Sequence, residues 1–299
     1  MATRRKAGKR GSGEATAAYS VIGTPRPKTD APGKVAGQTL FADDIVLPRM
    51  LWCKLLRSPH PHARIVSIDA SRALALPGVE AVLTGADLPI PFGILPVSQD
   101  EHALCPDVVR FVGDPVAAVA AVDEETALAA CGLIDVVYEP LPVIGSVDDA
   151  AATPAPQLHG YADEGNWHKL VHLQFGELDE GFRRADLVRE DLFLYEGNTH
   201  LPMEQHASIA HATPDGRVTV WSSTQTPHYL HRALSKVLDL PPARIRVIAT
   251  PNGGGFGGKS DPFGHEIVAA AMALKLGRPA RIALTREEVF YCHRGRHPV

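Results

Sequence analysis

The sequence is poor in the patterns that mark metal clusters, membrane spans and nucleic-acid surfaces. Its 299 residues contain four cysteines, and no two of them form a C-x-x-C pair: Cys53, Cys105, Cys131 and Cys292. This scatter argues against a zinc knuckle, an iron–sulfur cradle or a disulfide framework, and it predicts ordinary thiols of a reducing compartment. The longest apolar runs are far shorter than a membrane span. A formal net charge of −4 gives no indication of a nucleic-acid partner or a membrane surface.

The N-terminus carries a cluster of five basic residues, Arg4, Arg5, Lys6, Lys9 and Arg10. A twin-arginine export signal would need an apolar stretch after such a cluster, whereas residues 11–14 are small and polar. We therefore predict a disordered basic tail over residues 1–22 and place the protein in the cytoplasm.

Short apolar segments bounded by proline, glycine and aspartate predict a strand-rich first half. The predicted strands are 38–46, 50–57, 63–69, 79–84, 108–112, 115–122 and 133–138, and the predicted helices are 71–76 and 124–131. This mixture predicts an α/β domain over residues 23–145. The small and polar segment 146–165, which includes Pro154 and Pro156, is predicted to be a linker.

The second half, residues 166–299, shows a strand, helix, strand, helix, strand order. The predicted strands are 217–223, 244–250 and 279–284; the first helix starts at Pro227 after Thr226, and the second starts at Pro262 and ends at Gly277. Parallel pairing by crossovers is the default for this order. The turns 223–227 and 251–260 would then meet at the carboxyl edge of the sheet, where ligands of such sheets bind.

The second of these turns, "GGGFGGKS" at 253–260, matches the phosphate-loop pattern G-x-x-x-x-G-K-[ST]. In a phosphate loop the lysine and serine lie in the first turn of the helix, but Pro262 favours a helix that starts after Ser260. Five glycines around Phe256 instead allow close approach of the backbone to a flat or bulky ligand. A nucleotide hydrolase remains a remote alternative.

The order "STQTPH", helix, strand and "GGGFGGKSDPFGHEIVAA" resembles the large molybdenum subunit of the xanthine oxidase family of molybdenum hydroxylases. Residues 33–145, with "RSPHPHARIVSID" and "VRFVGDPVAAVAAVDEETA", are similar to that family's α/β hammerhead domain, and residues from about 170, with "LPMEQHASIAHA", to its first molybdopterin-binding domain. The resemblance implies a mixed α+β and α/β fold made of these two domains in this order.

The resemblance also implies roles for particular residues. Gln225 corresponds to a glutamine whose side-chain amide lies beside an oxo ligand of molybdenum, and Gly255, Phe256 and Gly257 to the loop that closes over the metal and its dithiolene. Gly257 would offer its backbone N–H, and Phe256 would line the substrate channel. No residue of the chain is implied as a direct ligand of molybdenum. Glu204 corresponds to a carboxylate behind the site, for which a structural hydrogen-bond network is the favoured interpretation over catalysis.

Further implications concern cofactors and partners. The family uses a molybdopterin, here predicted in its cytosine dinucleotide form, and its electrons pass through 2Fe–2S clusters and FAD, which we expect on partner subunits. The family's large subunit continues beyond "HRGRHPV" with further dinucleotide contacts and a general-base glutamate, so we expect a second chain that supplies this half through an apolar surface. A truncated product and a non-catalytic fragment or cofactor-assembly protein are the alternatives.

The substrate is predicted to be a small aromatic compound. The resemblance implies that many members have a carboxylate or another polar group, positioned to hold a substrate, where this chain has Ser260, which argues against purines. The segment 91–104, "PFGILPVSQDEHAL", is closest to the branch of 4-hydroxybenzoyl-CoA reductase, and hydroxylation of an aldehyde or an N-heterocycle remains open.

Overall fold

The computed structural model describes residues 19–96, 98–152, 156–160, 165–291 and 294–298. The chain divides into two compact units, residues 1–39 and 40–299. The described part of the first unit contains one short helix, α1 (Ala31–Val35), with a proline in its first turn. Of the predicted basic tail, residues 1–18 lie outside the described residues, and residues 19–22 are exposed turns and bends.

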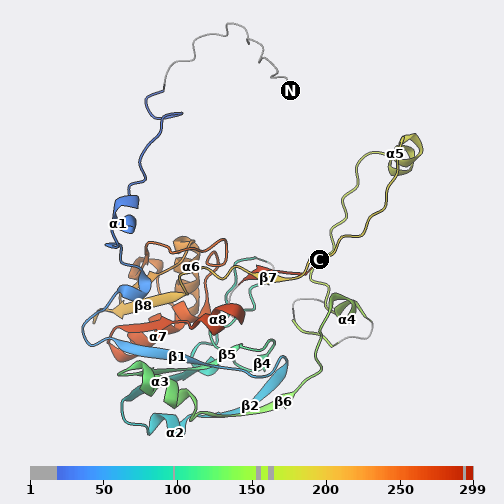
Figure 1. The fold of residues 1–299 in the computed structure, drawn as a ribbon. Helices are drawn as coiled ribbons and strands as arrows, with labels where there is room; N and C mark the ends of the chain where they lie inside the picture. Colours follow the sequence, from blue (N-terminus) through green and yellow to red (C-terminus); the bar gives the residue numbers. More distant parts are fainter. Residues whose placement is uncertain (1–18, 97, 153–155, 161–164, 292–293, 299) are drawn as a thin grey trace, which may run out of the picture. The chain divides into compact units, whose positions relative to one another are not determined.

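The second unit is organised around a seven-stranded sheet with the order β10-β9-β8-β11-β1-β5-β3 (Figure 1). Its strands are β1 (Leu51–Arg57), β3 (Val79–Thr84), β5 (Pro115–Ala121), β8 (Ala207–Ala212), β9 (Val218–Ser222), β10 (Ile245–Ala249) and β11 (Ala280–Ala283). The parallel pair β1–β11 joins the strands of the first half to those of the second, with Leu51 opposite Ala280. One sheet therefore runs through both halves of the sequence.

Helices cover both faces of the middle of this sheet. The alternating side chains of β5 show this, because Ala118 and Ala120 pack in one apolar cluster with residues of α7 (Gly264–Leu276), whereas Ala117 and Val119 pack in another with residues of α3 (Glu124–Cys131). A strand that is buried on both faces reads as a continuous apolar run, which is the pattern of residues 115–121. Two further helices, α6 (Pro227–Val237) and α2 (Ser71–Leu74), contact β10 and β3.

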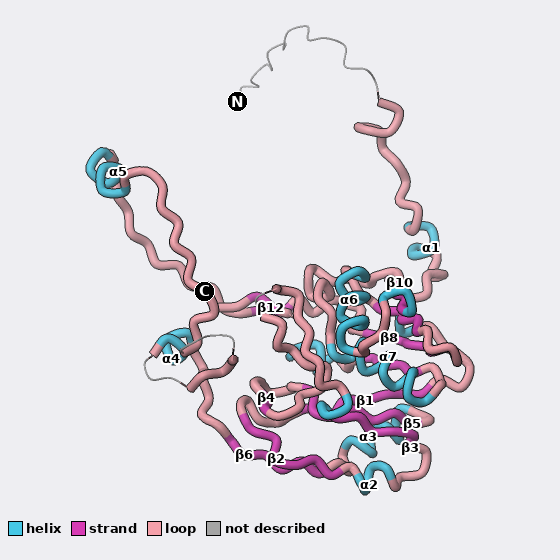
Figure 2. The backbone as a smooth tube through the Cα atoms, turned by 180° about the vertical axis from the view of Figure 1, so that it is seen from behind, coloured by secondary structure: helices cyan, strands magenta, loops and turns pink. Residues whose placement is uncertain are grey.

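Smaller elements complete the described chain (Figure 2). A three-stranded sheet has the order β4-β2-β6, and a two-stranded sheet pairs β12 with β7. These elements are β2 (Ala63–Asp69), β4 (Val108–Val109), β6 (Asp135–Pro140), β7 (Asn198–Thr199) and β12 (Gly295–Arg296), with helices α4 (Val147–Ala151), α5 (Leu178–Arg184) and α8 (Arg286–Tyr291) and 3-10 helices at Ala42–Asp44, Gly85–Asp87 and Pro242–Arg244. No helix among the described residues has the length and apolar character of a membrane span.

Two predictions of secondary structure are wrong. Residues 38–46 form no strand, because the Asp44 carboxylate accepts a hydrogen bond from the Phe41 N–H at 2.9 Å and closes a short 3-10 helix. The helix expected to start at Pro262 starts at Gly264, and Asp261 does not cap it, because its carboxylate pairs with Arg294. The predicted end of that helix is confirmed, since Gly277 follows it with a φ of 61°.

The expected parallel arrangement is confirmed for β9 and β10, which pair in parallel from Val218 opposite Ile245. The third strand, β11, runs in the same direction but is separated from β9 by β8, which pairs antiparallel with both. The segment that forms β8, 207–212, lies before the pattern from which the parallel sheet was predicted.

Candidate functional site

Three chain segments meet at one edge of the large sheet. The segments that follow β9 and β10 leave from the carboxyl ends of two parallel strands, and residues 200–206 enter the antiparallel β8 at the same edge. Hydrogen bonds tie the first two together: the Gln225 N–H donates to the Lys259 carbonyl oxygen at 2.8 Å, and the Thr226 hydroxyl donates to the Ser260 carbonyl oxygen at 2.6 Å. The two predicted turns therefore form one site.

Gln225 clamps the glycine-rich loop from its side-chain oxygen. Oε1 accepts hydrogen bonds from the backbone N–H groups of Gly257 at 3.1 Å and Lys259 at 3.3 Å, and from the Ser260 hydroxyl at 3.4 Å. The Nε2 group of this amide makes no hydrogen bond with another described residue, and the residue is exposed. The amide thus holds the loop with one end and presents two N–H donors with the other.

The loop backbone requires its glycines for two different reasons. Gly254 and Gly257 have φ angles of 116° and 89°, which side chains rarely adopt. Gly253 and Gly255 are crowded instead: a Cβ at Gly253 would lie 2.6 Å from the Glu204 Cβ, and one at Gly255 would lie 2.5 Å from the Gln225 Cδ. Phe256, between Gly255 and Gly257, has a φ of 54° and a side chain that is 72% exposed.

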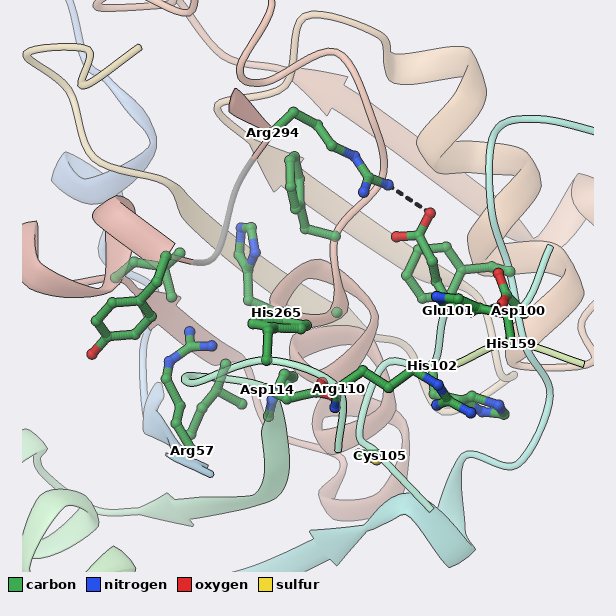
Figure 3. A pocket seen from close by; sticks show the side chains of 18 residues that line it. Arg57, Asp100, Glu101, His102, Cys105, Arg110, Asp114, His159, His265 and Arg294 are labelled. Atoms are coloured by element: carbon green, nitrogen blue, oxygen red, sulfur yellow. Dashed lines mark hydrogen bonds and ion pairs between the residues drawn. The ribbon is translucent and has the colours of Figure 1, made fainter. Parts of the chain in front are cut away.

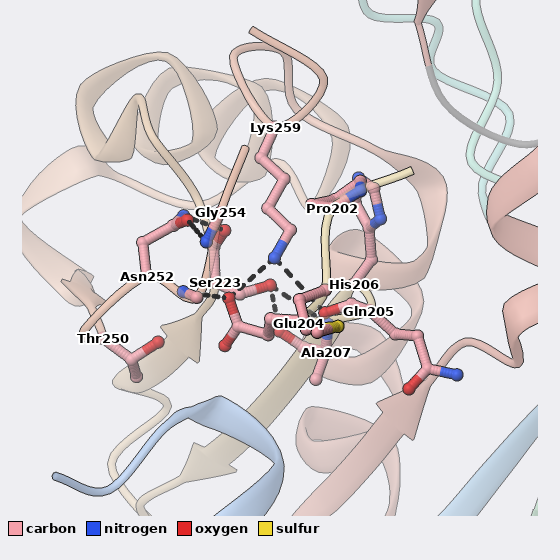
Figure 4. A network of polar contacts seen from close by, with 12 residues as sticks. Pro202, Glu204, Gln205, His206, Ala207, Ser223, Thr250, Asn252, Gly254 and Lys259 are labelled. Atoms are coloured by element: carbon pink, nitrogen blue, oxygen red, sulfur yellow. Dashed lines mark hydrogen bonds and ion pairs between the residues drawn. The ribbon is translucent and has the colours of Figure 1, made fainter. Parts of the chain in front are cut away.

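Behind the loop, Lys259 and Glu204 form a buried ion pair (Figure 4). The Lys259 side chain is 1% exposed, and its Nζ donates to Glu204 Oε2 at 2.7 Å and to the Gln205 carbonyl oxygen at 3.3 Å. The same carboxylate oxygen accepts from the Gly253 N–H at 2.8 Å. Burial lowers the pKa of Lys259, and Glu204 opposes this shift. Lys259 therefore faces the protein interior, away from the position of a phosphate-loop lysine.

Asn252 and Thr226 also hold the loop, through contacts that their positions in the sequence do not predict. The Asn252 side chain donates to the Ser223 carbonyl oxygen at 3.0 Å and accepts from the Gly254 N–H at 2.9 Å, so it links the two turns. Thr226 stands directly before α6 as predicted, but its hydroxyl bonds to Ser260 rather than capping the helix. An asparagine directly before glycines is a turn signal, which could have identified Asn252.

A buried carboxyl group belongs to Glu266, in the first turn of α7, the helix that follows the glycine-rich loop. It accepts from the Ser222 hydroxyl at 2.5 Å and from the Phe263 N–H at 2.8 Å. Burial raises the pKa of Glu266 to about 7, although both hydrogen bonds act in the opposite direction. Its neighbour His265 is also buried, which lowers the pKa of that imidazole well below its ordinary value.

A cavity of about 450 Å³ is lined by His265, by apolar side chains and by several charged residues (Figure 3). Its charged lining residues pair with one another or with backbone groups: Arg294 with Glu101, Arg57 with the Gly113 carbonyl oxygen at 2.9 Å, and Asp114 with the Arg110 N–H at 3.1 Å. The rings of His265 and His206 lie 5.8 Å apart, and His206 Nε2 is 3.3 Å from the Gly258 carbonyl oxygen. The cavity wall thus adjoins the rear of the glycine-rich loop.

The described part of the chain offers no group of three or more His, Cys, Asp or Glu side chains that could hold a metal ion. His62 Nδ1 lies 2.6 Å from the Pro142 carbonyl oxygen, and the His60 ring packs edge-on against Tyr138. The glycine-rich edge fits a large cofactor better than a protein-ligated ion. It combines an exposed amide with two unused donors, an exposed phenyl ring and a loop with no side chains to obstruct close approach.

Two family models match the chain, in the order of the fold. Residues 36–142 match the aldehyde oxidase and xanthine dehydrogenase a/b hammerhead domain, and residues 160–299 match the molybdopterin cofactor-binding domain. The chain belongs to the xanthine oxidase family of molybdenum hydroxylases. The expected fold, a hammerhead domain followed by a molybdopterin-binding domain, is confirmed.

Relatives in this family have names that differ in substrate. The chain is 39% identical to a probable xanthine dehydrogenase subunit of Bacillus subtilis, over 93% of this chain and 37% of that protein. It is 37% identical to the nicotinate dehydrogenase large molybdopterin subunit of Eubacterium barkeri, over 94% of this chain and 65% of that one. Quinoline 2-oxidoreductase of Pseudomonas putida 86 superposes with a TM-score of 0.84 at 31% identity, over 92% of this chain and 36% of that structure. The chain thus spans between one third and two thirds of these relatives' lengths.

Proposed function

We propose that the chain forms the hammerhead and first molybdopterin-binding region of the molybdenum subunit of an oxidoreductase that acts on an aromatic substrate. The observation that carries this proposal is the clamp of Gln225 on the glycine-rich loop. It fixes a bare backbone and a side-chain amide at the same sheet edge, with the amide Nε2 turned outward.

In this proposal the residues of the chain bind and orient the cofactor, which supplies two-electron oxidation or reduction at carbon when it is bound. Gln225 would hold the cofactor by donating a hydrogen bond from Nε2, because its Oε1 already holds the loop. Gly255 and Gly257 would allow close approach of the loop. Phe256 would line the substrate channel, since its ring is exposed.

One departure from the implied family roles concerns Gly257. Its N–H already donates to Gln225 in this structure, at 3.1 Å. We therefore propose that Gly257 acts first by positioning Gln225. If its N–H also contacted the cofactor, the one N–H would be shared between Gln225 Oε1 and the cofactor.

Cofactor form and partner subunits extend the proposal. We propose the cytosine dinucleotide form of the molybdopterin, 2Fe–2S clusters on a small partner subunit and FAD on another. Three described cysteines, Cys53, Cys105 and Cys131, are buried free thiols, and burial raises the pKa of each to about 12. Such thiols suit neither cluster ligation nor disulfide formation, which supports electron carriers on other chains and a cytoplasmic location.

The remaining part of the active site would come from polypeptide equivalent to the rest of the relatives. The chain covers 37% of the Bacillus subtilis relative but 65% of the Eubacterium barkeri one, so the same region occurs in polypeptides of different lengths. This supports a remainder that can be encoded in more than one way. A non-catalytic assembly protein is the alternative, and it predicts cofactor binding without turnover. A phosphate-loop hydrolase is opposed by the burial of Lys259 and by the start of α7 four residues after Ser260.

For the substrate we propose an N-heterocycle, because relatives named for nicotinate and quinoline share this region. Reductive dehydroxylation of 4-hydroxybenzoyl-CoA is the second candidate, supported by the resemblance of residues 91–104, and an aromatic aldehyde is the third. Turnover assays with quinoline, nicotinate, 4-hydroxybenzoyl-CoA and benzaldehyde would separate these candidates.

The test is purification of the native complex through a tag on this chain. We expect molybdenum, a releasable pterin dinucleotide, iron and flavin, and turnover that falls by roughly ten- to a hundredfold in the Gln225→Ala variant when one preorganised hydrogen bond is lost. Gln38→Ala, at an exposed position of the first unit, is the control. A colourless preparation without molybdenum, or saturable MgATP binding that is lost on Lys259→Ala, would refute the proposal.

A further inference from the structure

The segment 167–197 is exposed along almost its whole length. Figures 1 and 2 show it as a two-limbed excursion of the chain with α5 at its tip. From residue 167 to residue 197 every residue is exposed except the half-buried Glu180. We call residues 167–197 the arm, residues 169–176 its outgoing limb and residues 186–197 its returning limb.

The arm exposes large apolar side chains that a solvated loop does not need. Five of them are more than four-fifths exposed: Leu173 85%, Phe175 93%, Leu192 86%, Phe193 83% and Leu194 84%. Single exposed apolar residues are ordinary on protein surfaces, but contiguous groups of this kind mark an interaction surface. The concentration of these side chains in the limbs indicates that something packs against them.

The limbs also have the sequence pattern of strands without the pairing of strands. Val171, Leu173 and Phe175 alternate with polar residues in the outgoing limb, and residues 192–195 of the returning limb, "LFLY", form a short continuous apolar run. No backbone hydrogen bond joins either limb to another described residue outside the turn around α5. Exposed backbone donors and acceptors along an apolar extended segment are a template for strand addition.

The returning limb leads directly into a sheet. It continues into β7, where Thr199 pairs with Gly295 and Asn198 with Arg296. A strand added beside the returning limb would therefore extend the strand geometry of β7. The residues that follow β7, 200–206, carry Glu204 and reach the glycine-rich edge, so the arm is joined to the candidate site by a few residues of chain.

We propose that the arm is the docking element for the remainder of the molybdenum subunit, and that this remainder pairs with its limbs by strand addition. The region that this chain shares with the Bacillus subtilis relative is 37% of that protein, and the region shared with the quinoline 2-oxidoreductase structure is 36% of that one. The shared region retains its fold when nearly twice as much polypeptide accompanies it, since the TM-score is 0.84. This inference rests on the proposed function, because it takes the occupant from that subunit.

The probe is the polypeptide from the same genome that matches the Bacillus subtilis relative beyond the shared region, produced separately whether it is encoded as a second chain or as a continuation of this one. Hydrogen exchange of the full 299-residue chain is measured alone and with this polypeptide. We expect the limb amides to exchange rapidly in the chain alone and roughly tenfold or more slowly in the complex, because strand pairing protects backbone amides.

Paired variants test the side chains. Leu173→Asp with Phe175→Asp, and separately Leu192→Asp with Leu194→Asp, should raise the dissociation constant by roughly tenfold or more, because buried apolar anchors carry most interface energy. Val35→Asp, at a site that is 90% exposed in the first unit, should leave it unchanged. Since all these positions are exposed in the free chain, the melting temperature of each variant alone should match that of the parent.

Each other outcome contradicts a specific part of the proposal. A genome without such a polypeptide, a complex with limb amides that still exchange rapidly, or limb variants that bind like the parent would overturn it. Limb amides protected in the chain alone, with a dimeric mass in sedimentation, would assign the arm to a second copy. Molybdenum in a complex with an unprotected arm refutes this inference alone, whereas a protected arm in a complex that cannot be loaded with molybdenum refutes only the proposed function.

Discussion

At the scale of single residues, the two glycines of the loop beside Phe256 differ in what they require. Gly255 has no room for a side chain because Gln225 lies against it, whereas a Cβ on Gly257 would have, among the described residues, only the His200 Nε2 nearby, at 3.8 Å. The need for glycine at Gly257 comes from its φ of 89°. Of these two glycines, therefore, Gly255 is required by steric crowding and Gly257 by its backbone angle. The run of glycines in the sequence does not distinguish the two reasons.

Gly255→Ala should displace the Gln225 side chain and lower turnover of the assembled complex by roughly tenfold or more, because the oriented amide is lost. The control is Gly145→Ala, where a Cβ would have the Asp149 Oδ2 at 3.9 Å as its neighbour. Turnover and melting temperature are measured for both variants. Equal activity of the two would show that the loop can shift to accept a methyl group.

Glu266 gives a pH dependence of stability. Below its unfolded pKa of 4.5 the group is protonated in both states; between 4.5 and about 7 the unfolded chain releases a proton that the folded chain keeps. The folded state then binds more protons, so the free energy of unfolding decreases as pH rises through this window, by up to about 3 kcal/mol. Glu266→Gln should remove this decrease.

The measurement is urea unfolding of Glu266→Gln and the parent between pH 4.5 and 8. The advantage of the variant over the parent should grow up to pH 7 and then stay constant. Glu287→Gln, which changes an exposed glutamate, is the control. A pH-independent difference for Glu266→Gln would show that the carboxyl is ionised in the folded protein throughout.

At the scale of elements, the glycine-rich loop is fixed from behind by the segment that enters β8. Lys259 reaches from the loop to Glu204, and Glu204 returns a contact to the Gly253 N–H. Glu204 Oε1 is buried without a hydrogen-bond partner among the described residues, so its charge is balanced chiefly by Lys259. Removing one partner of such a pair leaves an uncompensated buried charge.

Lys259→Met should therefore lower the free energy of unfolding by about 3–5 kcal/mol, and the double variant with Glu204→Gln should recover part of this loss. Lys275→Met is the control, because Lys275 is 47% exposed and its Nζ lies 3.5 Å from Asp87 Oδ1. That exposed pair should contribute less than about 1 kcal/mol. The measurement is denaturant unfolding of the parent, the double variant, Lys259→Met and Lys275→Met. Similar losses of unfolding free energy in Lys259→Met and Lys275→Met would contradict the importance of burial.

Most strands could be predicted from the sequence, and their order could not. Residues 50–57, 63–69, 79–84, 115–122 and 244–250 alternate or run apolar and form strands close to these bounds. The alternation identifies a strand but carries no information about its neighbour, so β8 between β9 and β11 and the pairing of β1 with β11 were not foreseen. Residues 38–46 have strand-like composition, but the contact of Asp44 with the Phe41 N–H outweighs it.

The candidate site was predictable only where a local sequence motif marks it. Gln225 and the glycines stand in a long ordered motif, and two turns after parallel strands must meet at one edge. The pairing of Lys259 with Glu204 joins residues 55 positions apart, and neither has a local signal that names the other. The role of Asn252 was visible in its position before Gly253, but only as a turn.

At the scale of the whole molecule, the continuous sheet joins the two regions that the family models separate. Because β1 lies between β5 and β11, residues 40–299 should unfold in one cooperative transition. Trp52 on β1 and Trp221 on β9 report on the two regions. Fluorescence of single-tryptophan variants at these positions should give the same midpoint in urea, and two separate midpoints would show that the regions unfold independently.

The pairing of Leu51 with Ala280 has a consequence for synthesis on the ribosome. At about 5–20 residues per second, a ribosome that has made β1 needs roughly ten to fifty seconds to reach β11. During that time one side of β1 presents open backbone groups and the apolar Leu51, which are a template for pairing with other nascent chains. Yield of correctly folded protein should therefore depend on chaperones that bind this early strand and on the speed of translation between β1 and β11.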